Sequence, residues 1–89
     1  MITAHVASSD GVDIPIYDYA PGSTLGSVLF SHATGFHGQC FNSTAASLAN
    51  SAHCYSFDYR GYGDATLPHD WKVTWGGYGD DAHVVAQHV

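Results

Sequence analysis

Two short apolar runs, each followed by a loop that contains glycine, constrain the fold of this 89-residue chain more than any other feature. The runs lie within residues 27–31 and 54–58, and neither shows the alternation of a half-exposed strand. Strands with apolar residues on both sides are typical of a parallel sheet covered by helices. Between the runs, residues 39–50 place apolar side chains at helical spacing. The sequence therefore predicts a strand, a helix and a second, parallel strand.

The N-terminal part of the chain favours an antiparallel hairpin. We expect one short strand over residues 3–7, a turn at Ser9-Asp10-Gly11, and a second strand over residues 12–19. Apolar and polar side chains alternate along this second strand, which indicates that one of its faces is exposed. Pro15 has no backbone N–H to give to a sheet, so we expect it at a sheet edge.

The last predicted element is a helix over residues 75–89. Asp80 and Asp81 are expected in its first turn, where the helix dipole favours negative charge. The predicted order is therefore β-β-β-α-β-α. In an α/β fold, such a helix leads to a further parallel strand, and none follows within these 89 residues. We therefore expect residues 1–89 to form the N-terminal fragment of one larger α/β domain.

Charge and composition limit the partners of the chain. Asp and Glu outnumber Lys and Arg by eight to two, and the net charge is -6 with histidine neutral. Arg60 and Lys72 are isolated, whereas nucleic acids and anionic membranes attract clustered basic residues, so neither partner is expected. The sequence shows no apolar run that spans a bilayer and no secretory signal, which favours a cytoplasmic location. Cys40 and Cys54 are expected to be reduced thiols rather than a disulfide.

Three segments together resemble a known family. Residues 29–38 (LFSHATGFHG) are similar to the loop after an apolar strand that binds an oxyanion in α/β-hydrolases. Residues 57–64 (FDYRGYGD) resemble that family's Asp-x-Arg-Gly-x-Gly-x-Ser turn, and residues 75–81 (WGGYGDD) resemble the segment that leads to its nucleophile strand. The resemblance implies the N-terminal part of an α/β-hydrolase fold: a hairpin, then βαβα, in three α/β/α layers that end before the nucleophile strand.

The resemblance implies a serine hydrolase, of the esterase or lipase kind, that cleaves an ester or related acyl bond of a small molecule. Such enzymes carry the nucleophile in G-x-S-x-G, and no serine of this chain has glycine both two residues before it and two residues after it. The acid and the catalytic histidine follow later in the family. The chain alone is therefore expected to be inactive, and an aspartate nucleophile in the missing part is an open alternative. No cofactor is expected.

The resemblance assigns roles to the first loop. The backbone N–H of Thr34 is expected to form half of an oxyanion hole, and the other donor follows the missing nucleophile. His32 is expected to hold the loop by a ring hydrogen bond rather than to act in acid–base chemistry. Gly35 is a structural residue of the same motif. Ala33 stands where the family more often has glycine.

The second loop is expected to be structural. Arg60 can bind loop carbonyls or pair with Asp58 or Asp64. Gly61 and Gly63 are expected to adopt positive φ in the turn. Asp64 replaces the usual small polar residue of the motif, which a turn tolerates.

Two other features have competing interpretations. His32, His37 and Cys40 lie close in sequence, but no pair has a compact metal-finger spacing, so no metal site is expected. The aromatic residues Trp71, Trp75 and Tyr78 either line a substrate mouth or, as we expect, pack over the sheet.

A second functional hypothesis is a small, non-catalytic binding or accessory domain. An open sheet edge then needs a partner or a second copy to cover it, so this hypothesis predicts self-association through that edge.

Overall fold

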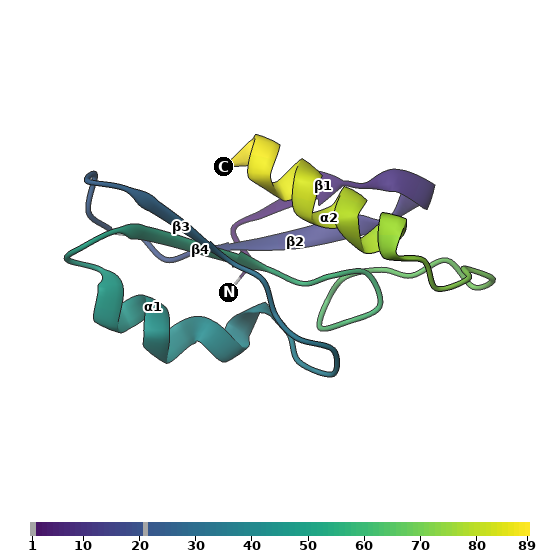
Figure 1. Cartoon of the computed structure of the whole chain (residues 1–89), viewed down its shortest axis with the longest axis horizontal. Helices are drawn as coiled ribbons and strands as arrows, with labels where there is room; N and C mark the ends of the chain where they lie inside the picture. Colours follow the sequence, from purple (N-terminus) through teal and green to yellow (C-terminus); the bar gives the residue numbers. More distant parts are fainter. Residues whose placement is uncertain (1, 21) are drawn as a thin grey trace.

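The computed structural model describes residues 2–20 and 22–89, and its elements follow the predicted order. These elements include four strands and two α-helices, and Figure 1 shows the two helices on opposite sides of the strands. Two short 3₁₀ turns, Ser9–Gly11 and Gly38–Phe41, separate some of the larger elements. The strands and helices are β1 (Ala4–Ala7), β2 (Asp13–Asp18), β3 (Ser27–Phe30), α1 (Asn42–Leu48), β4 (His53–Phe57) and α2 (Trp75–His88).

The four strands form one mixed sheet in the order β1-β2-β4-β3. β1 and β2 pair antiparallel, with Val6 opposite Ile14, which confirms the predicted hairpin. β3 and β4 pair parallel, with Leu29 opposite Tyr55, which confirms the predicted strand–helix–strand unit. β2 joins the two units through its antiparallel pairing with β4.

Pro15 lies on a central strand, so the prediction that it sits at a sheet edge is wrong. The carbonyl oxygen of Pro15 accepts a 3.4 Å hydrogen bond from the N–H of Asp58, so the backbone of Pro15 faces β4. The paired residues of β2 and β4 start at Ile16, one residue further along. The nitrogen of Pro15 therefore faces β4 just beyond the end of the β2–β4 ladder, while on its other side Pro15 lies opposite His5 in the β1–β2 pairing.

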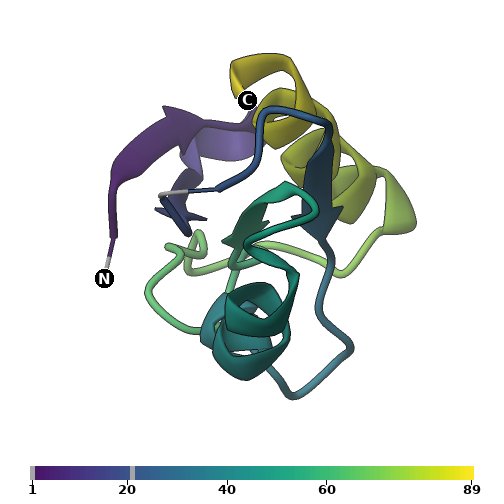
Figure 2. The same cartoon turned by 90° about the vertical axis from the view of Figure 1, so that its left-hand side faces the viewer.

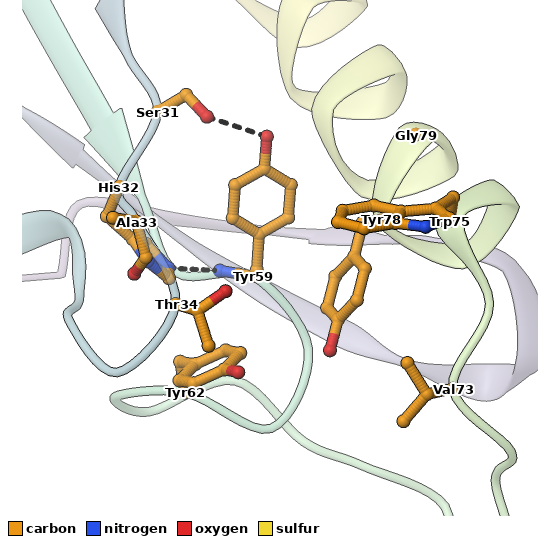
Figure 3. Close-up of a pocket in the computed structure, with 10 residues that line it drawn as sticks. All are labelled: Ser31, His32, Ala33, Thr34, Tyr59, Tyr62, Val73, Trp75, Tyr78 and Gly79. Carbon is orange, nitrogen blue, oxygen red and sulfur yellow. Dashed lines mark hydrogen bonds between the residues drawn. The ribbon is translucent and has the colours of Figure 1, made fainter.

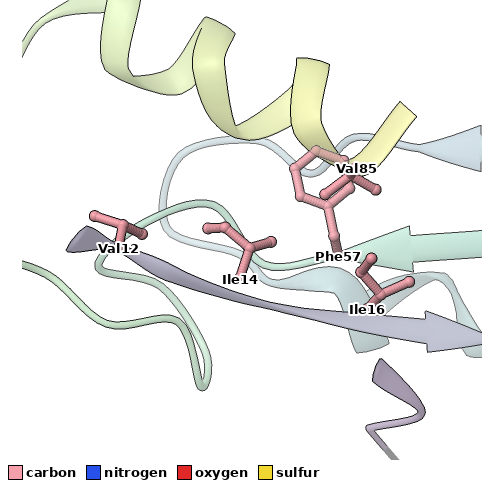
Figure 4. Packing of buried hydrophobic residues seen from close by; sticks show 5 residues of the cluster. All are labelled: Val12, Ile14, Ile16, Phe57 and Val85. Atoms are coloured by element: carbon pink, nitrogen blue, oxygen red, sulfur yellow. The ribbon is translucent and has the colours of Figure 1, made fainter. Parts of the chain in front are cut away.

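The helices cover opposite faces of the sheet, which confirms the three-layer arrangement (Figures 1 and 2). The main core lies on the face that α2 covers (Figure 4). There, Val85 of α2 packs against residues of β2, against Val12 just before β2, and against Phe57 of β4. These five side chains are almost fully buried: Val12, Ile14, Ile16, Phe57 and Val85.

A smaller core lies under α1. Ala45 packs with Ala52 and Cys54, and Val28 and Phe30 of β3 cover it from the side. Residues 28–30 are only partly buried, so the prediction that this run is buried on both faces is not met in this chain. The reason is the position of β3 at the edge of the sheet, where one side has no neighbouring strand in the described part of the chain.

The α-helix predicted from residue 39 begins only at Asn42, after a 3₁₀ turn. Gly38 is bound to the sheet on both sides of its backbone: its N–H donates to Asp58, and its carbonyl accepts from Ser56. A Cβ atom at this position would lie 2.7 Å from the carbonyl oxygen of Phe57. The close approach of Gly38 to β4 thus delays the helix. Neither helix in the described ranges is long and apolar enough to cross a membrane.

Candidate functional site

A cavity of about 790 Å³ lies where β3 and β4 end (Figure 3). The loop after β3 contributes residues 31–34, and the loop after β4 contributes Tyr59 and Tyr62. Val73 and the start of α2 close the other side. The chain leaves β3 toward α1 on one face of the sheet, and it leaves β4 toward α2 on the other face (Figure 1). Divergent connections of this kind open a crevice at the carboxyl ends of strands, where α/β proteins bind ligands.

Both ring nitrogens of His32 are occupied by hydrogen bonds to backbone atoms. The N–H of Tyr59 donates to Nε2 at 2.9 Å, so this nitrogen carries no proton. Nδ1 therefore carries the proton and donates to the carbonyl oxygen of Ala33, also at 2.9 Å. The ring joins the two loops of the site and is 7% exposed. With both nitrogens engaged, His32 has no atom left to exchange a proton with a ligand.

A turn follows His32. The N–H of Phe36 donates to the carbonyl of Ala33 at 3.0 Å, and Gly35 has a φ of 86°. This hydrogen bond and a positive φ at the third residue are typical of a type II turn, for which glycine is suited. Thr34 occupies the second position. Within residues 2–20 and 22–89, its backbone N–H meets no hydrogen-bond acceptor.

Asp58 holds three segments around the end of β4. Its buried carboxylate accepts hydrogen bonds from the hydroxyl of Tyr17 (2.6 Å), the N–H of Gly38 (2.7 Å) and the N–H of Asp64 (2.9 Å). Burial, together with the hydrogen bond to Asp58, raises the pKa of Tyr17 well above its ordinary value. Asp58 thus fixes the far end of the 32–38 loop and the 59–64 turn to the same strand.

The glycines of the second loop behave as predicted. Gly61 and Gly63 both have positive φ, of 79° and 51°. A Cβ atom on Gly63 would lie 2.3 Å from Oδ2 of Asp58, so the turn needs glycine there for space as well as for conformation.

Arg60 pairs with carboxylates and donates to the loop carbonyl of Ser9 at 3.4 Å, as expected, but the two named carboxylates, Asp58 and Asp64, are not its partners. Its guanidinium is fully buried, and Nη2 lies 2.8 Å from Asp81 of α2. Nη1 lies 2.8 Å from Asp10 of the first 3₁₀ turn. The hydrogen bonds to Asp81 raise the pKa of Arg60. The reason for the difference is direction: the side chain leaves the turn toward α2, while Asp58 points back to the sheet and is already satisfied.

Sequence reasoning missed Asp81 as the partner, and it placed Asp80 and Asp81 in the first turn of the helix. The helix begins at Trp75, and no acidic residue lies in its first turn. Asp81 is four residues before Val85 and four after Gly77, and all three are buried on the same face. This spacing was the signal that could have identified Asp81 as an inward-facing carboxylate.

The aromatic residues at the start of α2 divide between packing and the cavity. Trp71 is a packing residue, but it packs on Arg60: its ring centroid lies 5.0 Å from Cζ of the guanidinium. Trp75 is 88% exposed and borders the cavity, so the packing prediction is wrong for this residue. Tyr78 does both, since it contacts Tyr59 and Trp75 edge to face while lining the cavity. Burial, and then the neighbouring Tyr62, raises the pKa of Tyr78.

Cysteine and histidine form no cluster in the described part of the chain. Across residues 2–20 and 22–89, no three His, Cys, Asp or Glu side chains are grouped so as to hold a metal ion. Cys40 is an exposed thiol within the 3₁₀ turn Gly38–Phe41, and Cys54 is a buried thiol in β4.

Comparisons with known proteins identify the fold. No family profile and no curated protein sequence matches the chain. Among solved structures, an esterase from Exiguobacterium antarcticum is similar to this chain, with a TM-score of 0.80 and 23% identity over 98% of this chain. An α/β hydrolase from Sphaerobacter thermophilus gives 0.76 at 24% identity over 96% of it. The Bottromycin epimerase BotH gives 0.71 at 23% identity over 96% of it.

The chain spans about a third of each of these proteins: 31%, 31% and 34% of their lengths. At this level of identity, the likeness establishes the fold, which is that of a part of the α/β-hydrolase domain.

Proposed function

We propose that this chain is the N-terminal part of a serine hydrolase of the α/β-hydrolase fold, whose whole form cleaves an ester or related acyl bond. The observation that carries the proposal is the Thr34 N–H, which has no acceptor among the described residues and belongs to a loop that borders the cavity. An oxyanion hole needs such a donor, fixed in place before charge develops on the substrate oxygen. The similarity to an esterase and a hydrolase supports the same reaction class.

The handedness of strand connections supports a position near Thr34 for the proposed nucleophile. The β3–α1–β4 connection passes over one face, and α2 lies on the other face. Parallel strands are joined by right-handed crossovers, so a strand that follows α2 runs back past β4 and pairs with the open edge of β3. Its carboxyl end then reaches the same cavity. A nucleophile on the turn after that strand faces the loop that contains Thr34.

In this mechanism, residues of the 89-residue chain position the loops of the site and stabilise the tetrahedral intermediate. His32 and Asp58 fix the two loops, and the N–H of Thr34 donates to the oxygen of the tetrahedral intermediate. Each donor of an oxyanion hole contributes about 3–4 kcal/mol to lowering the barrier. The nucleophile, the acid and the catalytic base belong to the remainder of the domain, so the 89 residues alone have no turnover.

Two measurements test this proposal. The purified 89-residue protein is assayed with p-nitrophenyl acetate beside free histidine at the same imidazole concentration, and no excess rate is expected. The reading frame downstream of the Val89 codon is then sequenced. An apolar strand followed by G-x-S-x-G within about 15–20 residues is expected, because an elbow needs one strand before it. Excess turnover by the short protein, or a stop codon, contradicts the proposal.

The role of Thr34 is tested in the continuous polypeptide. Thr34→Pro removes the N–H together with the threonine hydroxyl, and proline suits the second position of this turn. We expect kcat to fall by about 10²–10³-fold. Thr34→Ala keeps the N–H and is expected to retain kcat within about threefold, since a threonine hydroxyl outside the reaction contributes little. Equal losses in the two variants overturn the assignment.

The alternative is a non-catalytic domain that associates through its sheet edge. The observation in its favour is β3: its apolar residues are partly exposed, and no strand formed by residues 2–20 or 22–89 pairs with its outer side. A stop codon after Val89 together with a discrete oligomer in sedimentation supports this alternative.

A further inference from the structure

We propose that the cavity takes an uncharged aromatic or alicyclic acyl group, in preference to an anionic or a cationic one. The inference rests on the proposed function and names its substrate class. It follows from the chemistry of the cavity walls, the charges around them and the polar atoms left for a ligand (Figure 3).

The walls of the cavity are aromatic. Tyr59 and Tyr62 rise from one loop, and Tyr78 and Trp75 face them from α2 (Figure 3). The ring centroids of Tyr59 and Tyr78 are 5.7 Å apart, and those of Trp75 and Tyr78 are 6.2 Å apart, both edge to face. A flat, apolar group adds further edge and face contacts of this kind, which aromatic rings favour.

Among residues 2–20 and 22–89, no Asp, Glu, Lys or Arg side chain lines the cavity. The lining includes His32, and both of its ring nitrogens are engaged by the backbone. The nearby guanidinium of Arg60 is buried and paired with Asp81 and Asp10. An anionic ligand therefore loses its hydration without gaining a counter-charge. A cationic ligand can contact the faces of the aromatic rings, but it gains no ion pair with Asp81, because Asp81 already binds Arg60.

The polar atoms of the cavity favour a carbonyl group beside the ring. The hydroxyls of Ser31 and Tyr59 are hydrogen-bonded to each other at 2.7 Å. The N–H of Thr34 remains without an acceptor among the described residues and can donate to one oxygen. An apolar ring joined to a carbonyl, as in a phenylacetyl group, satisfies both the walls and this donor.

The test uses the 89-residue protein, labelled with ¹⁵N, and three probes of matched shape. Methyl phenylacetate is neutral, phenylacetate is anionic and phenethylammonium is cationic. Amide shifts of Thr34 and Gly35 and the indole N–H shift of Trp75 report binding. We expect the neutral ester to shift these three signals and to bind about tenfold more tightly than either ion, a difference of about 1.4 kcal/mol.

Variants localise the binding. Trp75→Ala is expected to weaken methyl phenylacetate by about threefold to tenfold, since one aromatic contact is lost. Gln87→Ala, at the other end of the same helix and exposed, is the matched control and leaves affinity unchanged. Dispersed amide signals establish that each variant is folded before a probe is added. Equal or tighter binding of an ion, or shifts confined to other residues, overturns the inference.

A second measurement, in the continuous enzyme, tests the same inference if the 89-residue protein does not fold alone. In the continuous enzyme, kcat/KM for p-nitrophenyl phenylacetate is compared with that for mono-p-nitrophenyl succinate, whose acyl group carries a carboxylate. At least a tenfold preference for the phenylacetyl ester is expected, and the reverse order overturns the inference. Hydrolysis of the succinyl ester alone supports the proposed hydrolase function and rejects only the substrate class. Binding of methyl phenylacetate without hydrolysis of either ester supports the ligand class and rejects the hydrolase function.

Discussion

Arg60 joins three segments that are far apart in the sequence. Its backbone N–H and its guanidinium both bind Asp81, while Nη1 reaches Asp10 and Nη2 lies 2.9 Å from the hydroxyl of Ser9. The second loop, the first 3₁₀ turn and α2 are therefore held by one buried side chain. Removal of one member of such a group leaves an uncompensated buried charge, which costs more than the pair itself contributes.

Asp81→Asn tests this arrangement. We expect the free energy of unfolding to fall by about 3 kcal/mol, because Arg60 stays buried without its main counter-charge. Asp80→Asn is the control: it changes the net charge equally, but Asp80 is exposed. Its effect is expected to stay within about 0.5 kcal/mol. Urea denaturation followed by circular dichroism measures both, and equal losses would show that Arg60 does not depend on Asp81.

Tyr17 carries a prediction about alkaline pH. Its folded pKa is raised from the ordinary 10.0 by burial and then by the hydrogen bond to Asp58. A group whose folded pKa is raised stabilises the fold below its unfolded pKa, and this stabilisation is lost as pH rises through the folded value. Above pH 10 the unfolded chain releases the Tyr17 proton first. Stability should then fall by up to about 1.4 kcal/mol per pH unit for this one group.

Tyr17→Phe removes the group, so the decline in unfolding free energy above pH 10 should become shallower. Urea midpoints at several pH values between 9 and 11 provide the measurement. Tyr55→Phe is the control, since Tyr55 is only partly buried and lies on the same sheet. A decline that is unchanged in Tyr17→Phe would show that another group accounts for the alkaline loss.

At the scale of the element, α2 contains a matched pair of glycines. Gly79 has no atom within 4 Å of an added Cβ, whereas an added Cβ at Gly77 would lie 2.7 Å from the ring of Trp71 and 3.0 Å from Nη1 of Arg60. Both lie within the helix. Gly79→Ala is expected to stabilise the protein by about 0.5–1 kcal/mol through helix propensity.

Gly77→Ala carries the same gain in propensity, but the added Cβ would push Trp71 and Arg60 away from the helix, so a net loss of about 1–3 kcal/mol is expected. Thermal unfolding of the two variants in parallel measures the difference. Stabilisation of both would mean that Trp71 does not pack against the helix.

Local patterns were enough to predict most elements, and tertiary contacts account for the differences. The hairpin, the strands around α1 and the α2 helix all follow from periodicity over neighbouring residues. The central position of Pro15 depends on β4 pairing with β2, which no local pattern reveals. The partner of Arg60 lies 21 residues away in sequence, on a helix face that becomes clear only once Val85 is known to point inward. In the site, the motif identified the loop of Thr34, but the cavity border formed by Trp75 depended on where α2 begins.

At the scale of the whole molecule, the sheet is covered on both faces and open at the β3 side. β1 is also an edge strand, but in the proposed hydrolase chain handedness directs the strand that follows α2 toward β3. Both functional hypotheses involve this edge. In the proposed hydrolase, the edge of β3 pairs with the nucleophile strand, and in the alternative accessory domain it pairs with a second copy of the chain.

Ser27→Pro tests whether copies of the 89-residue chain pair through β3. The N–H of His53 in β4 donates to the carbonyl of Gly26, so strand alternation directs the N–H of Ser27 toward the open side. Proline at the first residue of an edge strand removes this donor and keeps the β3–β4 ladder. If the edge associates, sedimentation velocity should show a concentration-dependent oligomer for the native chain and at least about a tenfold weaker one for the variant, since edge hydrogen bonds drive such pairing.

Ser51→Pro would disturb the hydrogen bond that the N–H of Ser51 donates to Leu48, so Ser51→Ala, exposed and remote from the edge, is the better control. Its association should match that of the native chain. A monomer at every concentration in the native protein would remove the case for an edge-paired accessory domain, because the open strand would then be tolerated without a partner. An oligomer that Ser27→Pro leaves intact would place the contact elsewhere, and the exposed aromatic border of the cavity around Trp75 would be the next surface to vary.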